Sequence, residues 1–324
     1  MKKQIATWQL IASSLENDIP VLLFYVVESI GSSPGRKGFF MALNGKHEME
    51  GSIGGGIMEY KFIELGKEFL KENEKTSLIK RQVHDKKAGL NKSGMICSGE
   101  QTLLIYPVAK KNKETIQQII DLLIQHGTGS IEISPGGILL TNNIREESFQ
   151  LLNENEWTYN QNIGYQNHLY IIGGGHCSLA LSDLMSTMNF LIQVFDIRPD
   201  LNTVEKNYSA HEKILTESYT QLDNIIAGGN NHYVVIMTFG YRSDDEALRA
   251  LMNKNFKYLG VMGSKKKIEK MFETYRREGI LQTTLDKIQA PIGMQINSRT
   301  PEEIAVSIAA EIIKVKNQGQ KKNK

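Results

Sequence analysis

From residue 168 onward the chain alternates short apolar runs with amphipathic stretches. The apolar runs have the length and β-branched composition of buried strands, and the stretches between them repeat with the period of a helix. Alternation of this kind predicts a parallel sheet with helices on both faces. The predicted strands are HLYII, FLIQVFD, HYVVIMTF and FKYLGV, and the predicted helices are HCSLALSDLMSTMN, GYRSDDEALRALMNK, KKKIEKMFETYRREG and TPEEIAVSIAAEIIKV.

The first part of the chain has a less regular order of elements. Helical and strand-like patterns are mixed without strict alternation, which predicts a smaller α+β domain. Residues 141–166 are polar, rich in asparagine and weakly patterned, so the domain boundary is placed within or just after them, giving domains 1–160 and 161–324. The predicted elements are a helix at 4–16, strands at 20–29 and 39–44, a helix at 57–71, strands at 77–85 and 101–107, a helix at 113–127 and a hairpin at 130–140.

Helix ends carry three local signals. Thr300 and Glu303 have the spacing of a capping box, with Pro301 in the first turn, and Ser243 and Glu246 repeat that spacing. Gly127 closes the helix that begins near residue 113, because glycine adopts the left-handed conformation at a helix C-terminus.

Composition changes this picture mainly by exclusion. The 324 residues are 40% hydrophobic and 23% charged with a net charge of +2, which argues against nucleic acid as the main partner. The apolar runs are too short to cross a bilayer, so we expect no membrane association and a cytoplasmic location. The two cysteines stand far apart without a CxxC pair, and no structural metal site is predicted.

The turn at 173–175 carries the strongest chemical signal. Gly173, Gly175 and Ser178 have the spacing of the dinucleotide fingerprint, with serine at the third position, and Asp196 ends the next strand where a ribose-binding acid is expected. Free backbone N–H groups at the following helix would suit a phosphate. The pattern predicts a Rossmann-like domain with NAD(P) as a possible ligand; alternatively, the glycines only let the helix pack on the sheet.

Two residues beside this turn have open roles. His176 could reach a phosphate or donate a proton, or it could simply be exposed to water at the helix start. Cys177 is interpreted as a small residue of the first helical turn.

A second glycine-rich loop, GSIGGGIME at 51–59, is another candidate anion cradle. Ser52, Gly55 and Gly56 could hold an anion at the start of the helix, and Glu59 could take part or only match the helix dipole. Cys97, between Gly94 and Gly99, is a possible accessible thiol.

A third candidate lies at residues 264–267. Ser264 starts a helix whose first turn holds Lys265, Lys266 and Lys267, although cations there oppose the helix dipole. Either an anion binds at this point or the lysines are only solvated.

Taken together, these segments resemble the XdhC/CoxI family of accessory factors for xanthine dehydrogenase and related molybdenum hydroxylases. The resemblance runs through most of the chain. It is carried by ESIGSSPGRKGFFMAL, GSIGGGIME, GMICSGEQTLLIYP, LYIIGGGHCSLAL, DIRPD, YLGVMGSKKK and PIGMQINSRTPEEIAVSIAAEI.

The resemblance implies a cytoplasmic factor that binds molybdenum cofactor (molybdopterin) rather than a catalyst. It would present the cofactor for sulfuration by a sulfur-donating enzyme and pass it to the hydroxylase apoenzyme, and a homodimer is plausible. Two rival functions remain: an NAD(P)-dependent oxidoreductase, and a nucleotide-sensing module that binds without reacting.

The chain departs from the family pattern at three places. Ile57 stands where the family carries a cysteine, and Asn297 where glycine is common. The Thr-His-Asp of the family reads Thr238, Phe239, Gly240, with Asp244 and Asp245 following later.

Overall fold

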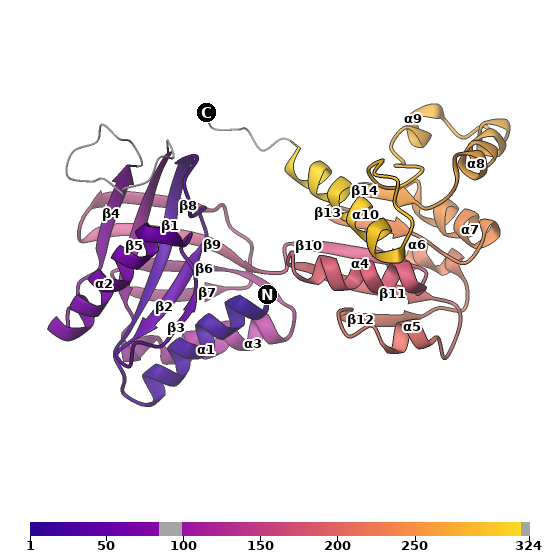
Figure 1. Cartoon of the computed structure of the whole chain (residues 1–324). Helices are drawn as coiled ribbons and strands as arrows, with labels where there is room; N and C mark the ends of the chain where they lie inside the picture. The colour runs from indigo at the N-terminus through magenta and orange to yellow at the C-terminus, as the bar shows by residue number, and fades with distance from the viewer. Residues whose placement is uncertain (84–98, 319–324) are drawn as a thin grey trace. The chain divides into compact units, whose positions relative to one another are not determined.

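A computed structural model describes residues 1–83 and 99–318, which divide into two compact units. Unit 1 spans Met1–Gly164 and unit 2 begins at Tyr165. The boundary predicted from the sequence, at residue 160, lies four residues before the end of unit 1. Both units are drawn in Figure 1, with the chain coloured from indigo to yellow.

Unit 1 contains two antiparallel sheets. The first has the strand order β3-β2-β1-β5-β4 and the second β7-β6-β9-β8. Unit 1 consists of α1 (Lys2–Glu16), β1 (Val21–Gly31), β2 (Phe40–Asn44), β3 (Met49–Gly51), α2 (Gly56–Glu72), β4 (Leu78–Val83), β5 (Gly99–Pro107), η1 (Lys110–Asn112), α3 (Lys113–Ile124), β6 (Thr128–Ser134), β7 (Gly137–Thr141), β8 (Ser148–Asn153) and β9 (Glu156–Gly164).

Alternation along β1 sends apolar side chains to both faces of the first sheet, so both faces are covered. Phe24 and its neighbours pack against α2. On the opposite face, Tyr25 stacks on Phe40 and contacts Tyr159 of β9, with ring centroids 5.0 Å apart in both pairs. Burying such aromatic rings supplies much of the stabilisation that holds the two sheets together.

Unit 2 is a doubly wound α/β unit around one parallel sheet. The strand order is β12-β11-β10-β13-β14, so the predicted Rossmann-like parallel sheet is confirmed. Unit 2 consists of β10 (Asn167–Ile172), α4 (His176–Ser186), β11 (Phe190–Asp196), α5 (Asn202–Glu205), β12 (Glu212–Leu215), η2 (Tyr219–Gln221), α6 (Leu222–Ile225), β13 (Gly229–Ile236), α7 (Tyr241–Leu251), β14 (Phe256–Val261), α8 (Lys265–Arg277), α9 (Gln282–Leu285) and α10 (Pro301–Asn317).

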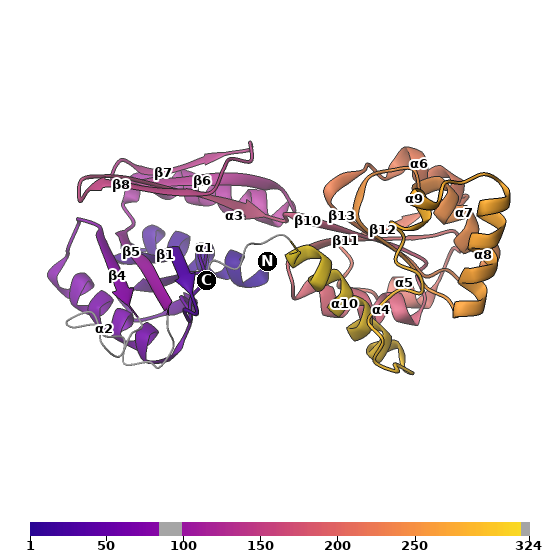
Figure 2. The same cartoon turned by 90° about the horizontal axis from the view of Figure 1, so that it is seen from above.

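Two apolar layers enclose this sheet. One face packs on α4 and α10, which lie side by side, and the other packs on α6, α7, α8 and α9 (Figures 1 and 2). Strand β10 is central and buried on both sides, which explains its nearly continuous apolar sequence.

Several local predictions are decided by the structure. The capping box of Thr300 and Glu303 is confirmed, with both reciprocal hydrogen bonds. The box at Ser243 is wrong: α7 begins at Tyr241, because Asp244 turns back to accept hydrogen bonds from Thr238. At the end of α3 the left-handed residue is His126, with φ of 60°, and Gly127 instead donates to Leu122 O.

The polar segment at 141–166 forms two strands that the sequence analysis did not predict. Strands β8 and β9 complete the second sheet of unit 1, and β9 buries Trp157 and Tyr159. The alternation is hard to recognise because the second sheet leaves much of β8 exposed, so polar residues stand at many strand positions.

Candidate functional site

The carboxyl ends of β10 and β13 form the topological switch point of unit 2. From β10 the chain proceeds to β11 and β12 on one side, and returns to β13 and β14 on the other. In open α/β sheets, ligands bind at the carboxyl ends of strands at such a point. The loop after β10 carries Gly173–Gly175, and the loop after β13 carries Thr238–Gly240.

The three glycines after β10 serve three different purposes. Gly173 has φ of 107°, and a Cβ atom there would meet Met237 O of the neighbouring loop. A Cβ atom at Gly174 would overlap the side chain of Val204, so α5 covers this position. Gly175 has an ordinary φ of −73° and no atom within 4 Å of a Cβ position. Of the three, Gly175 alone leaves space for an incoming group.

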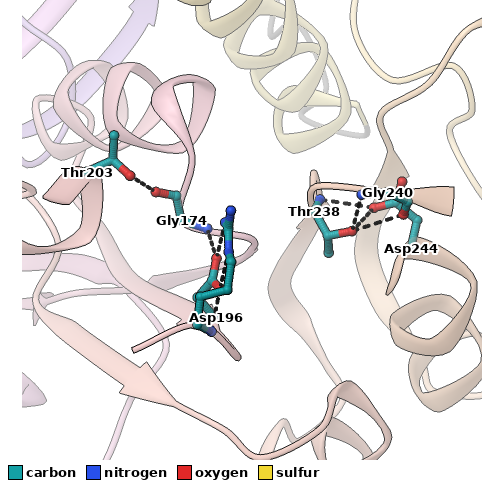
Figure 3. Close-up of polar contacts among 7 residues, drawn as sticks. Gly174, Asp196, Thr203, Thr238, Gly240 and Asp244 are labelled. Carbon is teal, nitrogen blue, oxygen red and sulfur yellow. Dashed lines mark hydrogen bonds and ion pairs between the residues drawn. The ribbon is translucent and has the colours of Figure 1, made fainter. Parts of the chain in front are cut away.

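Asp196, at the end of β11, binds the chain's own groups. Its carboxylate accepts Gly174 N–H at 2.6 Å, and the Arg198 Nε and Nη2 groups donate to its two oxygens at 2.9 and 2.8 Å (Figure 3). Burial acts to raise the pKa of the Asp196 carboxyl, but the hydrogen bonds from Arg198 and Gly174 outweigh it and hold the pKa below its ordinary value. The predicted ribose-binding acid therefore orders the glycine turn and Arg198.

Arg198 connects the two loops of the switch point. Its guanidinium carbon lies 4.8 Å from the centroid of the Phe239 ring, a cation–π contact. The sequence analysis did not assign a role to Arg198. Its position two residues after the strand-end acid was the available signal, since an arginine near this point accommodates a 2′-phosphate in NADP-binding units.

A second polar cluster lies at the loop after β13. Asp244 is buried and accepts hydrogen bonds from Thr238 N at 3.0 Å and Thr238 Oγ1 at 2.6 Å (Figure 3). Lys267 of α8 forms an ion pair with the same carboxylate. Lys267 is therefore occupied inside the fold. Ser264 caps α8 by accepting Lys267 N–H, while Lys265 is exposed.

The three candidate residues in the first turn of α4, His176, Cys177 and Ser178, have different surroundings. His176 is exposed and lines a groove of about 420 Å³ between α4 and α10, together with Pro301 and Glu302. Burial raises the pKa of the half-buried Cys177 thiol, so the thiolate is disfavoured. Ser178 is buried, and its hydroxyl has no hydrogen-bond partner in the described part of the chain. Among the residues that the structure describes, no side chain caps the helix start at Gly175.

In unit 1 the predicted anion cradle is filled by Glu59. Its Oε2 accepts Ser52 Oγ at 2.7 Å, Ile53 N at 2.9 Å and Gly55 N at 3.0 Å. Gly55 and Gly56 have positive φ with open space around a Cβ position, so conformation rather than packing favours glycine there. The loop thus closes around the first-turn carboxylate of the helix that follows it.

Three segments of unit 1 meet at this loop. A Cβ atom at Gly35 would overlap Ile53 O, one at Gly54 would overlap Gly35 N, and one at Gly99 would crowd Ser32. Gln101 joins them: its Oε1 accepts Gly35 N at 3.2 Å, and its Nε2 contacts Met58 Sδ at 3.0 Å. We call this meeting of 31–38, 51–56 and 99–101 the glycine junction. Gln101 was missed because its strand position looks ordinary.

Two further expectations concern thiols and metals. Cys97 lies outside the described residues. Within residues 1–83 and 99–318, no group of three or more His, Cys, Asp or Glu side chains could hold a metal ion. A search of the same residues finds no helix with the length and apolar character needed to cross a membrane.

Two family descriptions match separate parts of the chain. Residues 169–312 match the XdhC Rossmann domain, and residues 14–81 match the XdhC and CoxI family. The first match covers nearly all of unit 2 and the second lies within unit 1, so both units are represented.

Curated relatives are similar over part of their own length. The chain is 24% identical over 302 residues to the uncharacterized protein YqeB of Escherichia coli (strain K12), covering 93% of this chain and 44% of that protein. It is 25% identical over 156 residues to a Bacillus subtilis (strain 168) protein named as a probable xanthine dehydrogenase subunit, covering 48% of this chain and 45% of that protein. The chain thus spans less than half the length of these relatives.

A solved structure has the same fold. The crystal structure of a Bacillus halodurans protein described as a xanthine dehydrogenase superposes with a TM-score of 0.71, covering 98% of each chain at 21% identity. This similarity supports the arrangement of elements over the length of the chain.

Proposed function

The chain belongs to the XdhC and CoxI family, and from this premise we propose that it is an accessory factor for xanthine dehydrogenase-type molybdenum hydroxylases. It binds molybdenum cofactor, presents it for sulfuration and delivers it to the apoenzyme. Relatives named as a xanthine dehydrogenase, or as one of its subunits, support the choice of partner.

The single observation that carries the cofactor-binding proposal is the open position at Gly175. Helix α4 begins there without a side-chain cap, and its first backbone N–H groups have no partner within the helix. A helix start of this kind stabilises a phosphoryl group by hydrogen bonds and by the helix dipole. Space at the Gly175 Cβ position and the unpartnered hydroxyl of Ser178 fit the phosphate of the pterin.

Each residue at the switch point has a distinct role in the proposal. The first turn of α4 binds the phosphoryl group, and Arg198 adds positive charge next to it. Asp196 fixes Arg198 and the glycine turn by its hydrogen bonds. The bound cofactor supplies the molybdenum chemistry of the hydroxylase, while the chain binds and orients it.

The sulfur is proposed to come from a separate sulfur-donating enzyme. Ile57, directly after the glycine junction, provides no thiol, and burial raises the pKa of Cys177. A protonated, half-buried thiol is a poor nucleophile and a poor carrier of sulfur.

A second candidate function is NAD(P) binding without turnover, as in a nucleotide-sensing module. The observation that favours it is the pairing of Asp196 with Arg198 at the end of β11, where dinucleotide-binding units place the groups that contact ribose and 2′-phosphate. An oxidoreductase would also need a positioned acid or base. His176, the first residue of α4, instead lines the groove between α4 and α10.

The test combines the chain with its proposed client. Apo-hydroxylase is expressed with and without the chain, and its xanthine oxidation and molybdenum content are measured. Co-expression should raise both, and Gly175→Leu should abolish the increase. Because Gly175 has ordinary backbone angles and open surroundings, Gly175→Ala serves as a folded control with a smaller effect.

Two outcomes contradict the proposal. One is full activation of the hydroxylase by the Gly175→Leu chain. The other is oxidation of xanthine with NAD by the purified chain alone, because the proposal assigns that reaction to the hydroxylase.

A further inference from the structure

Phe239 places an exposed aromatic ring at the switch point. The residue is 58% exposed. Single exposed apolar side chains are common, so the position of this ring matters more than its exposure. Arg198 covers one face of the ring, with its guanidinium carbon 4.8 Å from the ring centroid. With this guanidinium in place the residue still exposes more than half of its surface, which leaves room for a second contact.

Both partners of this contact are held firmly in position. Arg198 is fixed by two hydrogen bonds to the buried Asp196, at 2.9 and 2.8 Å. Phe239 lies between Thr238, which is bound to the buried Asp244, and Gly240, the N-cap of α7. The fixed neighbouring backbone and the contact with Arg198 reduce the conformational freedom that a further contact would remove.

The ring also lies close to the proposed phosphate position. Phe239 follows β13 and Gly175 follows β10, and these strands are neighbours in the sheet. Their loops touch, because a Cβ atom at Gly173 would meet Met237 O. Gly240, next to Phe239, has no atom within 4 Å of a Cβ position, so the space beside the ring is open on that side as well.

We propose that Phe239, backed by Arg198, is a stacking platform for the planar heteroaromatic ring of a phosphorylated ligand. This inference rests on the proposed function and names the part of the site that recognises the ring. Nitrogen heterocycles stack on aromatic side chains, and the ligand's phosphoryl group binds at α4. The ligand class is a bicyclic nitrogen heterocycle that carries phosphate.

Two sources share this chemistry, a phosphorylated pterin and a purine nucleotide. The full chain is titrated with each probe separately, a pterin monophosphate and NADH, following their fluorescence. Inorganic pyrophosphate, which has no ring, is titrated by calorimetry. Phe239→Leu removes the aromatic face while keeping an apolar side chain of similar size.

Tyr208→Leu is the matched control. Tyr208 is 88% exposed and also forms a cation–π contact, with Lys213 Nζ 5.6 Å from its ring centroid, but that lysine belongs to β12, the edge strand of the sheet, and not to the loops after β10 and β13. We expect Phe239→Leu to lower the affinity for at least one ring-bearing probe by about tenfold, the effect of losing one stacking contact. Pyrophosphate affinity should stay within about twofold, Tyr208→Leu should bind as the parent chain does, and Phe239→Trp should restore ring binding.

The probe that responds identifies the source of the ring. The inference is overturned if Phe239→Leu binds both ring probes with unchanged affinity, or if its affinity for pyrophosphate falls as much as its affinity for the ring probes. It is also overturned if the parent chain binds neither ring probe. These results are separable from the proposed function, which is judged by hydroxylase activation. A chain that binds NADH through Phe239 and fails to activate the hydroxylase would retain the platform and reject the accessory role.

Discussion

The two glycine turns of this chain look alike in sequence and differ in what fills them. Each precedes a helix, and each directs backbone N–H groups toward a carboxylate of the chain itself. In unit 1 the carboxylate is Glu59, which comes from the following helix and accepts three hydrogen bonds. In unit 2 it is Asp196, which comes from the next strand and is also paired with Arg198.

The difference lies in what remains open. Glu59 occupies the loop of unit 1 with no ion-pair partner among the described residues. Asp196 takes Gly174 N–H, is neutralised by Arg198, and leaves the start of α4 at Gly175 uncapped. A glycine-rich turn before a helix is therefore insufficient to predict an external ligand. The position of the nearest carboxylate decides whether the turn is already satisfied.

The largest expected change in unfolding free energy comes from a glycine that the packing of unit 1 requires, Gly54, and is compared with that from Gly175, which has open surroundings. Gly54→Ala should destabilise unit 1 by on the order of 3 kcal/mol, because φ is 128° and the new Cβ atom would overlap the backbone of Gly35. Gly175→Ala should cost less, about 1 kcal/mol, because alanine is a poorer N-cap residue than glycine but its Cβ atom would meet no neighbouring atom. Urea unfolding measures both.

The chain's tryptophans make this measurement specific. Trp8 and Trp157 are the two tryptophans, and both are buried in unit 1, so their fluorescence follows unit 1. Far-ultraviolet circular dichroism follows both units. A Gly54→Ala chain with an unchanged fluorescence transition would show that the glycine junction tolerates a methyl group.

A second prediction concerns the neutralised carboxylate. Asp196→Asn should destabilise unit 2 by about 2 kcal/mol, because the amide can still accept Gly174 N–H but leaves Arg198 without its counter-charge. The circular dichroism transition should move and the tryptophan transition should not. Equal movement of both transitions would contradict the assignment of Asp196 to unit 2 alone.

The corresponding substitution in unit 1 removes the charge of Glu59. Glu59→Gln should cost about 1 kcal/mol, since the amide oxygen can still accept the loop N–H groups but loses the strength of a charged acceptor. The tryptophan transition reports this change. A cost larger than that of Asp196→Asn would reverse the comparison and make Glu59 the more important carboxylate.

The smallest expected effect is on how the stability of unit 2 depends on pH under acidic conditions. The pKa of Asp196 is lower in the folded chain than the unfolded value of about 3.9, so its stabilisation is complete above about pH 4 and is lost as pH falls through the folded pKa. Unit 2 of the parent chain should therefore lose stability over this range more steeply than the Asp196→Asn variant. If the parent chain and the Asp196→Asn variant lose stability equally as pH falls, measured by circular dichroism, the ion pair does not stabilise unit 2 as proposed.

The regular periodicity of unit 2 made its fold predictable. Strands β10, β11, β13 and β14 are continuous apolar runs because both faces of a parallel sheet are buried, and such runs are easy to recognise. In unit 1, β8 was missed because most of its residues are exposed, and β9 was missed because half-buried polar residues stand between its buried ones. The glycine at the end of α3 also gave a wrong prediction, because His126 rather than Gly127 takes the left-handed conformation.

The candidate site was predictable only in its parts. Gly175, Ser178 and Asp196 stand at motif spacing, so a sequence can reveal them. That Asp196 would bind Arg198, and that Lys267 would pair with Asp244 instead of remaining free, depends on contacts across strands. Motif spacing does not encode such contacts, and Arg198, Phe239 and Gln101 acquire their roles only through them.

The glycine junction also bears on the order in which unit 1 folds. Its contacts join Gly35 with Gln101, 66 positions apart along the chain, and bring Gly99 against Ser32. Pairing of β1 with β5 brings Gly31 beside Gly99 and closes nearly the same loop, so we expect the contacts of the junction to form after that pairing. Substitutions at the junction should therefore accelerate unfolding far more than they retard refolding.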